Sequence, residues 1–133
     1  MPYEVQWLVE GRVILAELIG DLSPDEMPAF NQLMHQYLDQ SDATKVHYIV
    51  DTTRIGKMTG LNPMRTFTFP KHPRMGWTVG VGISNPAIRM IGHVASYFFR
   101  MRAKEANTVE EGLAFLQRMD STLLAACPPQ PRG

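Results

Sequence analysis

Apolar and polar positions alternate most clearly in the stretch KVHYIVDTT, residues 45–53. Apolar side chains occur in both alternating sets, with Tyr48 in one set and Ile49 in the other. This pattern is typical of a strand that is covered on both faces of its sheet. We therefore predict that residues 45–53 form the central strand, followed by a loop at residues 54–60. Because ligands of open α/β sheets bind beyond the carboxyl ends of central strands, the first candidate site is residues 51–60.

The same alternation predicts four further strands, at residues 3–9, 13–19, 77–83 and 100–106. The first two strands are joined at Gly11 and form a hairpin at the start of the sheet. In the strand at residues 77–83, Gly80 and Gly82 leave one face nearly bare, which lets a helix or a ligand come close to the backbone. We expect close helix packing to be the use of this bare face.

Apolar residues at helical spacing predict helices at residues 24–40, 61–67, 86–99 and from 109 onward. Ser23 and Thr108 are each followed three residues later by a glutamate, which is the pattern of a capping box. Pro28 removes a backbone donor near the start of the first helix, so we expect either a distorted first turn or a helix that begins near Pro28. The segment FPKHPRMGW, residues 69–77, holds two prolines and a glycine and is predicted as loop.

Three of these helices carry apolar stripes that identify candidate core residues. In residues 24–40 the stripe is Met27, Phe30, Met34, Tyr37 and Leu38. In residues 86–99 it is Ala87, Ile88, Met90, Ile91, Val94, Ala95 and Phe98. In the last helix it is Leu113, Leu116 and Met119. The methionines of the first stripe leave a second interpretation open, a partner-binding groove.

Length and composition bound the class of protein. The chain of 133 residues is one domain's worth, 44% hydrophobic and 20% charged, as in ordinary globular proteins. We assign residues 1–126 to this domain and residues 127–133 to a disordered tail. The sequence shows no apolar run of about 18 residues and no signal-peptide pattern, so we expect a cytoplasmic protein without a transmembrane segment. Cys127 is the single cysteine, which excludes an internal disulfide.

The net charge of zero hides an uneven distribution. Residues 1–51 carry nine acids and two bases, residues 52–104 carry nine bases and no acid, and residues 105–133 carry four acids and two bases. Such asymmetry indicates a positive surface for an anionic partner, unless folding pairs these bases with the acids of residues 1–51. The best candidate for that surface, if it is not an ordinary solvated helix face, is the polar stripe Arg89, His93, Ser96 and Arg100.

Sequence patterns for catalysis and cofactor binding were sought without success. Gly56 and Lys57 are not followed by serine or threonine, so they do not form a P-loop. The four histidines fall on different predicted elements, without cysteine or carboxylate at ligand spacing, so we expect no metal and no cofactor. Turn formation explains the polar cluster Asp51, Thr52, Thr53 and Thr59.

Aromatic and basic residues are interleaved in the middle of the chain, at Arg65, Phe67, Phe69, Lys71, Arg74 and Trp77. A nucleic-acid stacking surface has this composition. Core aromatics with exposed bases between them are the simpler interpretation, so we expect no nucleic-acid partner.

In its order of elements the chain resembles the STAS-like superfamily of anti-sigma-factor antagonists, over residues 3–124. The most specific segments are VDTT at residues 50–53, WTVGVGISNP at residues 77–86 and NTVEEGLAFL at residues 107–116. The resemblance implies a small cytoplasmic domain that binds proteins or small ligands and has no catalysis of its own. It also implies a serine or threonine phosphorylated by a partner kinase, for which Thr59 is the closest position here, although the Asp-Ser-Gly type of motif is absent.

We therefore expect an α/β, STAS-like single domain, with an N-terminal β-hairpin, a mixed sheet of about five strands and helices packed against it. The expected function is a non-catalytic regulatory module that binds a protein partner. The alternative is a carrier or sensor of a small hydrophobic, lipid-like or anionic ligand. The hairpin at the sheet edge makes a homodimer a further expectation. The candidate binding residues are Asp51, Thr53, Arg54, Lys57, Thr59, Arg89, His93 and Arg100.

Overall fold

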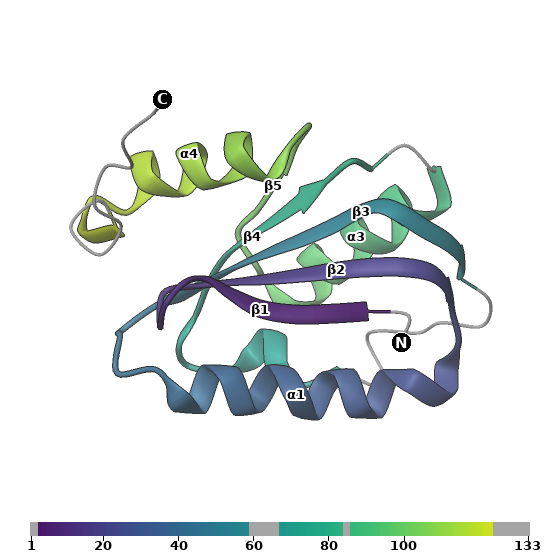
Figure 1. Cartoon of the computed structure of the whole chain (residues 1–133), viewed down its shortest axis with the longest axis horizontal. Helices are drawn as coiled ribbons and strands as arrows, with labels where there is room; N and C mark the ends of the chain where they lie inside the picture. The colour runs from purple at the N-terminus through teal and green to yellow at the C-terminus, as the bar shows by residue number, and fades with distance from the viewer. Residues whose placement is uncertain (1–2, 59–66, 84–85, 124–133) are drawn as a thin grey trace.

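The computed structural model describes residues 3–58, 67–83 and 86–123 (Figure 1). Its five-stranded sheet has the order β1-β2-β3-β4-β5. The strands are β1 (Tyr3–Val9), β2 (Val13–Leu22), β3 (Val46–Met58), β4 (Met75–Val81) and β5 (Ala103–Ala106). β1 is antiparallel to β2, and the other neighbours are parallel. The predicted mixed sheet, N-terminal hairpin and central position of β3 are confirmed.

Helices cover both faces of the sheet. They are α1 (Met27–Gln40), α3 (Pro86–Phe99) and α4 (Val109–Met119), with short 3-10 turns η1 (Pro24–Glu26) and η2 (Phe69–Lys71). α1 and α4 lie on opposite sides of the sheet (Figure 1). α3 lies on the same face as α1, since residues of both helices line one cavity with that face.

Alternation along the inner strands supplies both faces of the core. Ile14 and Tyr48 pack in a cluster with α1, whereas Leu15 and Ile49 pack in a second cluster with α4. All four side chains are buried. The prediction that the central strand is covered on both faces is therefore confirmed.

The predicted loop at residues 54–60 is wrong through Met58, because β3 continues there. Its partner is the end of β2, which also extends beyond the predicted boundary at residue 19, and the register pairs Gly20 with Ile55. A Cβ at Gly56 would come within 2.8 Å of the Gly20 carbonyl carbon, so glycine permits the close approach of the two strands. Residues 59–60 lie outside the described residues.

The two predicted capping boxes differ in outcome. At α4, the Thr108 hydroxyl accepts a hydrogen bond from the Glu111 backbone N–H at 3.1 Å, which confirms the cap. At the first helix, the Ser23 hydroxyl instead donates to the Glu26 carboxylate at 3.1 Å and caps no backbone donor. A 3-10 turn fills this position, and α1 begins at Met27 with Pro28 in its first turn, as one of the two alternatives for Pro28 expected.

Residues 67–77 are more ordered than the predicted loop. They contain η2, and β4 begins at Met75 because that residue pairs with Val46 of β3. The strand ends at Val81, before Gly82 turns the chain with a φ of +70°. Most of the short helix predicted at residues 61–67 lies outside the described residues, and Phe67 itself is not helical.

The passage from α3 to β5 is a helix cap where a strand was predicted. Arg100 has a φ of +55°, its N–H bonds to the Tyr97 carbonyl, and the Met101 N–H bonds to the Ser96 carbonyl. This pair of bonds is the Schellman motif. β5 therefore covers only Ala103–Ala106 of the predicted 100–106.

Two predicted apolar stripes are partly wrong. On α4, Leu116 is 0% exposed but Met119 is 49% exposed. On α3, the buried side chains include Phe99, whereas the predicted Met90, Val94 and Phe98 are exposed. Among the described residues, no helix is long and apolar enough to cross a membrane. The predicted tail at residues 127–133 lies outside them.

Candidate functional site

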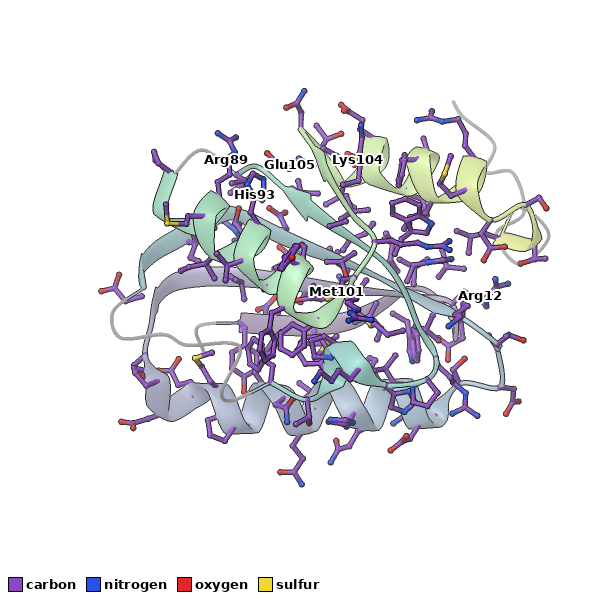
Figure 2. All side chains as sticks on the ribbon, turned by 180° about the vertical axis from the view of Figure 1, so that it is seen from behind. Arg12, Arg89, His93, Met101, Lys104 and Glu105 are labelled. Carbon is purple, nitrogen blue, oxygen red and sulfur yellow. The ribbon has the colours of Figure 1, made fainter. Side chains whose placement is uncertain are left out.

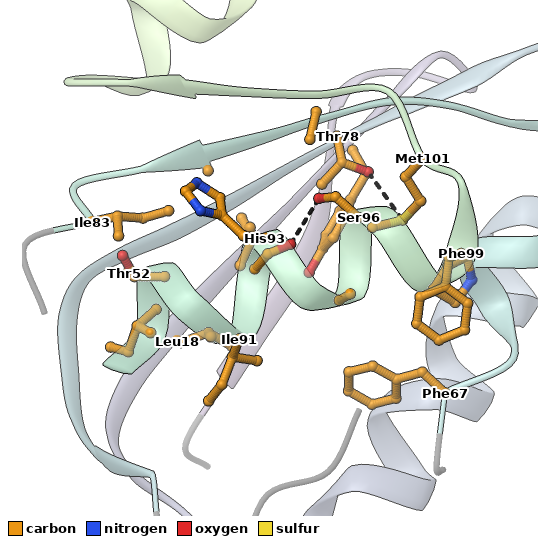
Figure 3. Close-up of a pocket in the computed structure, with 18 of the residues that line it drawn as sticks. Leu18, Thr52, Phe67, Thr78, Ile83, Ile91, His93, Ser96, Phe99 and Met101 are labelled. Atoms are coloured by element: carbon orange, nitrogen blue, oxygen red, sulfur yellow. Dashed lines mark hydrogen bonds between the residues drawn. The ribbon is translucent and has the colours of Figure 1, made fainter. Parts of the chain in front are cut away.

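A cavity of about 280 Å³ lies between α3 and the sheet (Figure 3). Tyr48 and Thr52 of β3 and Thr78 of β4 form its sheet side, while Ser96 and Phe99 contribute from α3. Further lining residues come from β2, α1, η1, η2 and β5 and from the segments between elements. Its wall is mostly apolar and carries a few polar groups, so it is the first candidate for a binding site.

Small residues on the facing elements leave this space open. Gly92 and Ala95 stand on the face of α3 that also carries the buried Ile88 and Phe99, because positions three and four apart share a helix face. A Cβ at Gly92 would meet no atom within 4 Å. A ligand that bound there in the folded state would stabilise the fold.

The bare face of β4 serves the cavity rather than close helix packing, contrary to our expectation. Gly80 lines the cavity on the sheet side. A Cβ at Gly82 would collide with the Thr53 side chain of β3, so this glycine accommodates a neighbouring strand.

Most of the cavity wall is aliphatic or aromatic. Leu18 and Val50 contribute from the sheet, Phe30 from α1, Phe69 from η2 and Ile91 from α3. Phe69 is buried and packs edge-on against Tyr48 and Phe30. These contacts support the interpretation of the aromatic residues in this part of the chain as core.

Three hydroxyl groups of the wall already have partners within the protein. Thr52 donates to the Val81 carbonyl at 2.9 Å, and Ser96 donates to the carbonyl one turn earlier in α3 at 2.7 Å. Thr78 donates to the Met101 sulfur at 3.8 Å. These groups do not demand a hydrogen bond from a ligand.

One polar group of the wall has unmet hydrogen-bonding capacity. Tyr48 is 6% exposed, and its hydroxyl bonds to no described residue. Burial raises the pKa of Tyr48 well above its ordinary value, so the hydroxyl remains a donor. The Glu26 Oε2 atom also lacks a partner among the described residues, but it has almost no accessible surface, so a molecule in the cavity would not reach it. Sequence reasoning missed Tyr48, because it reads as ordinary core.

The candidate residues Arg89 and His93 line this cavity with Lys104 and Glu105, and Arg89, His93 and Glu105 lie close together (Figure 2). Arg89 Nε donates to Glu105 Oε1 at 3.2 Å, and His93 Nε2 lies 3.5 Å from Glu105 Oε2. Arg100, at the other end of α3, is exposed and forms no ion pair with a described residue.

The candidate residues of β3 lie on the opposite face of the sheet from α3. Asp51 and Thr53 alternate with Thr52, which lines the cavity, and Asp51 Oδ1 accepts from the Thr53 N–H and hydroxyl at 2.9 and 2.7 Å. Arg54 pairs with Glu17 of β2 at 2.8 Å. The structure therefore does not join them with the α3 group into one surface. The Lys57 side chain and Thr59 lie outside the described residues.

The outer side of α3 is an exposed apolar surface. We call it the α3 outer face, and it consists of Met90, Val94, Tyr97 and Phe98. Tyr97 is 89% exposed and Met90 is 67% exposed. Our stripe analysis assigned three of these residues to the core, because amphipathic spacing does not state which side of a two-sided apolar helix is covered.

The buried His47 and the partly exposed Asp120 form a hydrogen-bonded pair. His47 Nε2 lies 2.9 Å from Asp120 Oδ2, and His47 Nδ1 accepts the Trp77 N–H at 3.0 Å. Arg12 and Thr122 hydrogen-bond to the same carboxylate. Among the described residues, no group of three or more His, Cys, Asp or Glu side chains is placed to hold a metal ion.

Comparison with solved structures finds similar folds at low sequence identity. One is the anti-sigma factor antagonist SpoIIAA in its unphosphorylated form, with a TM-score of 0.59, 15% identity, and coverage of 86% of this chain and 97% of that one. Another is an uncharacterised DUF3478 family protein with a SpoIIAA-like fold from Shewanella loihica PV-4, with a TM-score of 0.60, 11% identity, and coverage of 86% and 91%. No family model and no curated protein matches the sequence. This chain has the SpoIIAA-like α/β fold that its order of elements predicted.

Proposed function

We propose that this protein is a non-catalytic regulatory module of STAS type that binds a partner protein through the α3 outer face. The observation that carries the proposal is the exposure of four large apolar side chains along one helix. Contiguous exposed apolar residues mark interaction surfaces, and aromatic residues such as Tyr97 are favoured anchors at interfaces. The shared fold with an anti-sigma factor antagonist supports a regulatory role.

Charges beside the α3 outer face favour a partner with acidic residues around an apolar centre. Arg89 and His93 share the single carboxylate of Glu105, and Arg100 has no ion pair with a described residue. Lys71 Nζ lies 5.3 Å from the Phe98 ring centroid, which adds a fourth base to the rim. Complementary charge at a rim speeds association and selects among partners.

Photo-crosslinking from Tyr97 tests the surface. A benzoylphenylalanine at position 97 should capture a specific protein that the same probe at Gln36, an exposed residue of α1, does not capture. With that protein purified, the pair Met90→Ser and Tyr97→Ser should weaken binding about 30-fold or more, as expected for loss of anchor residues. The pair Gln32→Ser and Gln36→Ser is the matched control. Equal crosslinking at both positions, or a loss of less than about threefold, would exclude this surface.

The absence of catalysis is part of the proposal. His47 and Asp120 hydrogen-bond to each other and to Trp77 and Thr122 within the protein, which supports a structural role for the pair. We also propose a cytoplasmic location, no cofactor and no nucleic-acid partner, as the sequence indicates. Pairing at the exposed edge of β1 would provide the proposed homodimer.

Phosphorylation at Thr59 extends the proposal and rests on the family resemblance. The residues Asp51, Thr53, Arg54 and Lys57 would then contact the kinase, on a surface separate from the α3 outer face. Intact-mass measurement of protein purified from its own cells should show a phosphate that Thr59→Ala removes and Thr53→Ala retains. Equal phosphate in wild type and Thr59→Ala would exclude the site.

A second candidate function is a carrier or sensor of a small apolar ligand, and the cavity beneath α3 is the observation that favours it. Native mass spectrometry of gently purified protein should then show a bound small molecule. The Gly92→Leu variant should lack it, because the added side chain would enter the cavity. Equal masses of added ligand in the two proteins would place the ligand elsewhere.

A further inference from the structure

We propose that the cavity beneath α3 binds one small neutral molecule with an apolar body and a hydroxyl group. The inference rests on the second candidate function and names the ligand class. It does not depend on the α3 outer face, because the cavity is lined by the inward side of that helix.

The volume sets the size of the ligand. An engineered cavity of about 150 Å³ in another protein binds benzene, a molecule with six non-hydrogen atoms. The present cavity is about 280 Å³. By this proportion it takes a molecule of roughly a dozen non-hydrogen atoms, such as two fused rings or a short chain.

The wall requires that most of this molecule be apolar. Phe30, Phe69 and Phe99 approach it from three different elements, and Leu18, Val50 and Ile91 add aliphatic surface. The hydroxyls of Thr52 and Ser96 are engaged with backbone carbonyls. A polar body would therefore lose hydration without gaining hydrogen bonds.

The Tyr48 hydroxyl defines the polar part of the ligand. Tyr48 lines the cavity and its hydroxyl bonds to no described residue, so it can donate to a ligand oxygen. A ligand hydroxyl accepts this bond, whereas a hydrocarbon would leave it unmade.

The signs of the charged wall residues disfavour an ionic ligand. Glu26 and Glu105 repel an anion, while Arg89 and Lys104 repel a cation. Neither ionic class therefore has a wall of one complementary sign to offset the loss of its hydration.

Titration with 2-naphthol, naphthalene and 2-naphthoate tests the proposal, with methyl and amide NMR shifts as the readout. The wild type should bind 2-naphthol about tenfold more tightly than naphthalene, the worth of roughly one hydrogen bond. It should bind 2-naphthoate least tightly. Tyr48→Phe should reduce the preference for 2-naphthol several-fold and leave naphthalene binding unchanged.

Substitutions at Gly92 locate the binding. Gly92→Ala adds one methyl group into open space and should keep binding, whereas Gly92→Leu should abolish it. Both variants gain helix propensity, and the amide NMR spectrum of each variant shows whether it keeps the fold. Saturable binding that survives Gly92→Leu, no binding by wild type, equal affinity for 2-naphthol and naphthalene, or tightest binding of 2-naphthoate would each overturn the proposal. If native mass spectrometry still showed a bound molecule, the carrier function would stand and only this ligand class would fall.

Discussion

Arg100 is the one described residue other than glycine with a positive φ, and its backbone shape is set by the end of α3. A side chain in the left-handed region costs about 1–2 kcal/mol relative to glycine. We therefore predict that Arg100→Gly raises the free energy of unfolding by about 0.5–1 kcal/mol, measured by urea denaturation. Arg100→Ala is the matched control, since it removes the same charge but keeps a Cβ. If both variants were more stable than the wild type, the loss of the Arg100 charge, and not the backbone conformation, would explain the increase.

The ionisation of Asp120 makes the stability of the fold depend on pH. Burial alone would raise the pKa of Asp120, but hydrogen bonds from Thr122 and His47 outweigh it and hold the pKa below its usual value. A carboxyl group with a lowered pKa stabilises the fold above its unfolded pKa of about 3.9 and loses that contribution as pH falls through the lower folded value.

The substitution Asp120→Asn tests this pH dependence. At pH 7 it should lower the free energy of unfolding by about 1–3 kcal/mol, because bonds to a charged acceptor are lost. The gap between variant and wild type should narrow below about pH 4, as followed by urea denaturation at each pH. Asp42→Asn, at an exposed position, should show no such gap. A gap for Asp120→Asn that stays constant down to pH 2 would contradict the assignment.

At the scale of elements, α4 offers a direct test of which side faces the sheet. Leu116 packs with Ile49 and Val79 in the second core cluster, whereas Met119 projects into solvent. Leu116→Ala should cost about 2–5 kcal/mol of stability, and Met119→Ala less than about 0.5 kcal/mol, in thermal or urea unfolding. Equal losses of stability in the two variants would indicate that Met119 also faces the sheet, as the spacing predicted.

The sequence predicts most elements but not all of their ends. Alternation around Tyr48 identified β3, because burial on both faces is visible in local pattern. The extension of β3 to Met58 was missed, since it depends on pairing with a segment of β2 more than 30 residues earlier. The cap at Arg100 was also missed. Helices that end in a left-handed residue usually have glycine there, so arginine gave no local signal that the helix ends.

The candidate site was only partly visible in the sequence. The bare face at Gly80 and the charged pair Arg89 and His93 were noticed, and all three line the cavity. The cavity itself depends on the separation of α3 from the sheet, which no local pattern encodes. The sequence feature that could have indicated the cavity is the pair of small residues Gly92 and Ala95, on the face of α3 that faces Gly80.

At the scale of the whole molecule, we expect the two core clusters to unfold as one cooperative unit. Neighbouring residues of the same strands, such as Ile14 and Leu15, point into different clusters. We predict a single calorimetric transition with equal calorimetric and van't Hoff enthalpies. Met34→Ala on the α1 side and Leu116→Ala on the α4 side should both lower the midpoint of that same transition. Two resolved transitions would contradict the prediction that residues 1–126 form one domain.

Folding pairs only part of the basic middle segment with carboxylates. Arg54 of the acid-free middle pairs with Glu17 of the acidic first third, as the second interpretation of the charge pattern proposed. Arg89 pairs with Glu105, which follows that middle segment directly. Arg100, Arg102 and Lys104 are exposed and form no ion pair with a described residue, although Arg102 and Lys104 pack on aromatic rings, so a positive surface remains.

The hydrogen bonds from Arg12 to Asp120 and Thr122 join residues about 110 positions apart. A ribosome therefore completes β3 about 60 residues before the end of α4, an interval of several seconds at roughly 5–20 residues per second. Val13, Leu15 and Ile49 share their core cluster with Leu116 of α4. We therefore expect the nascent chain to expose these apolar side chains until α4 is made.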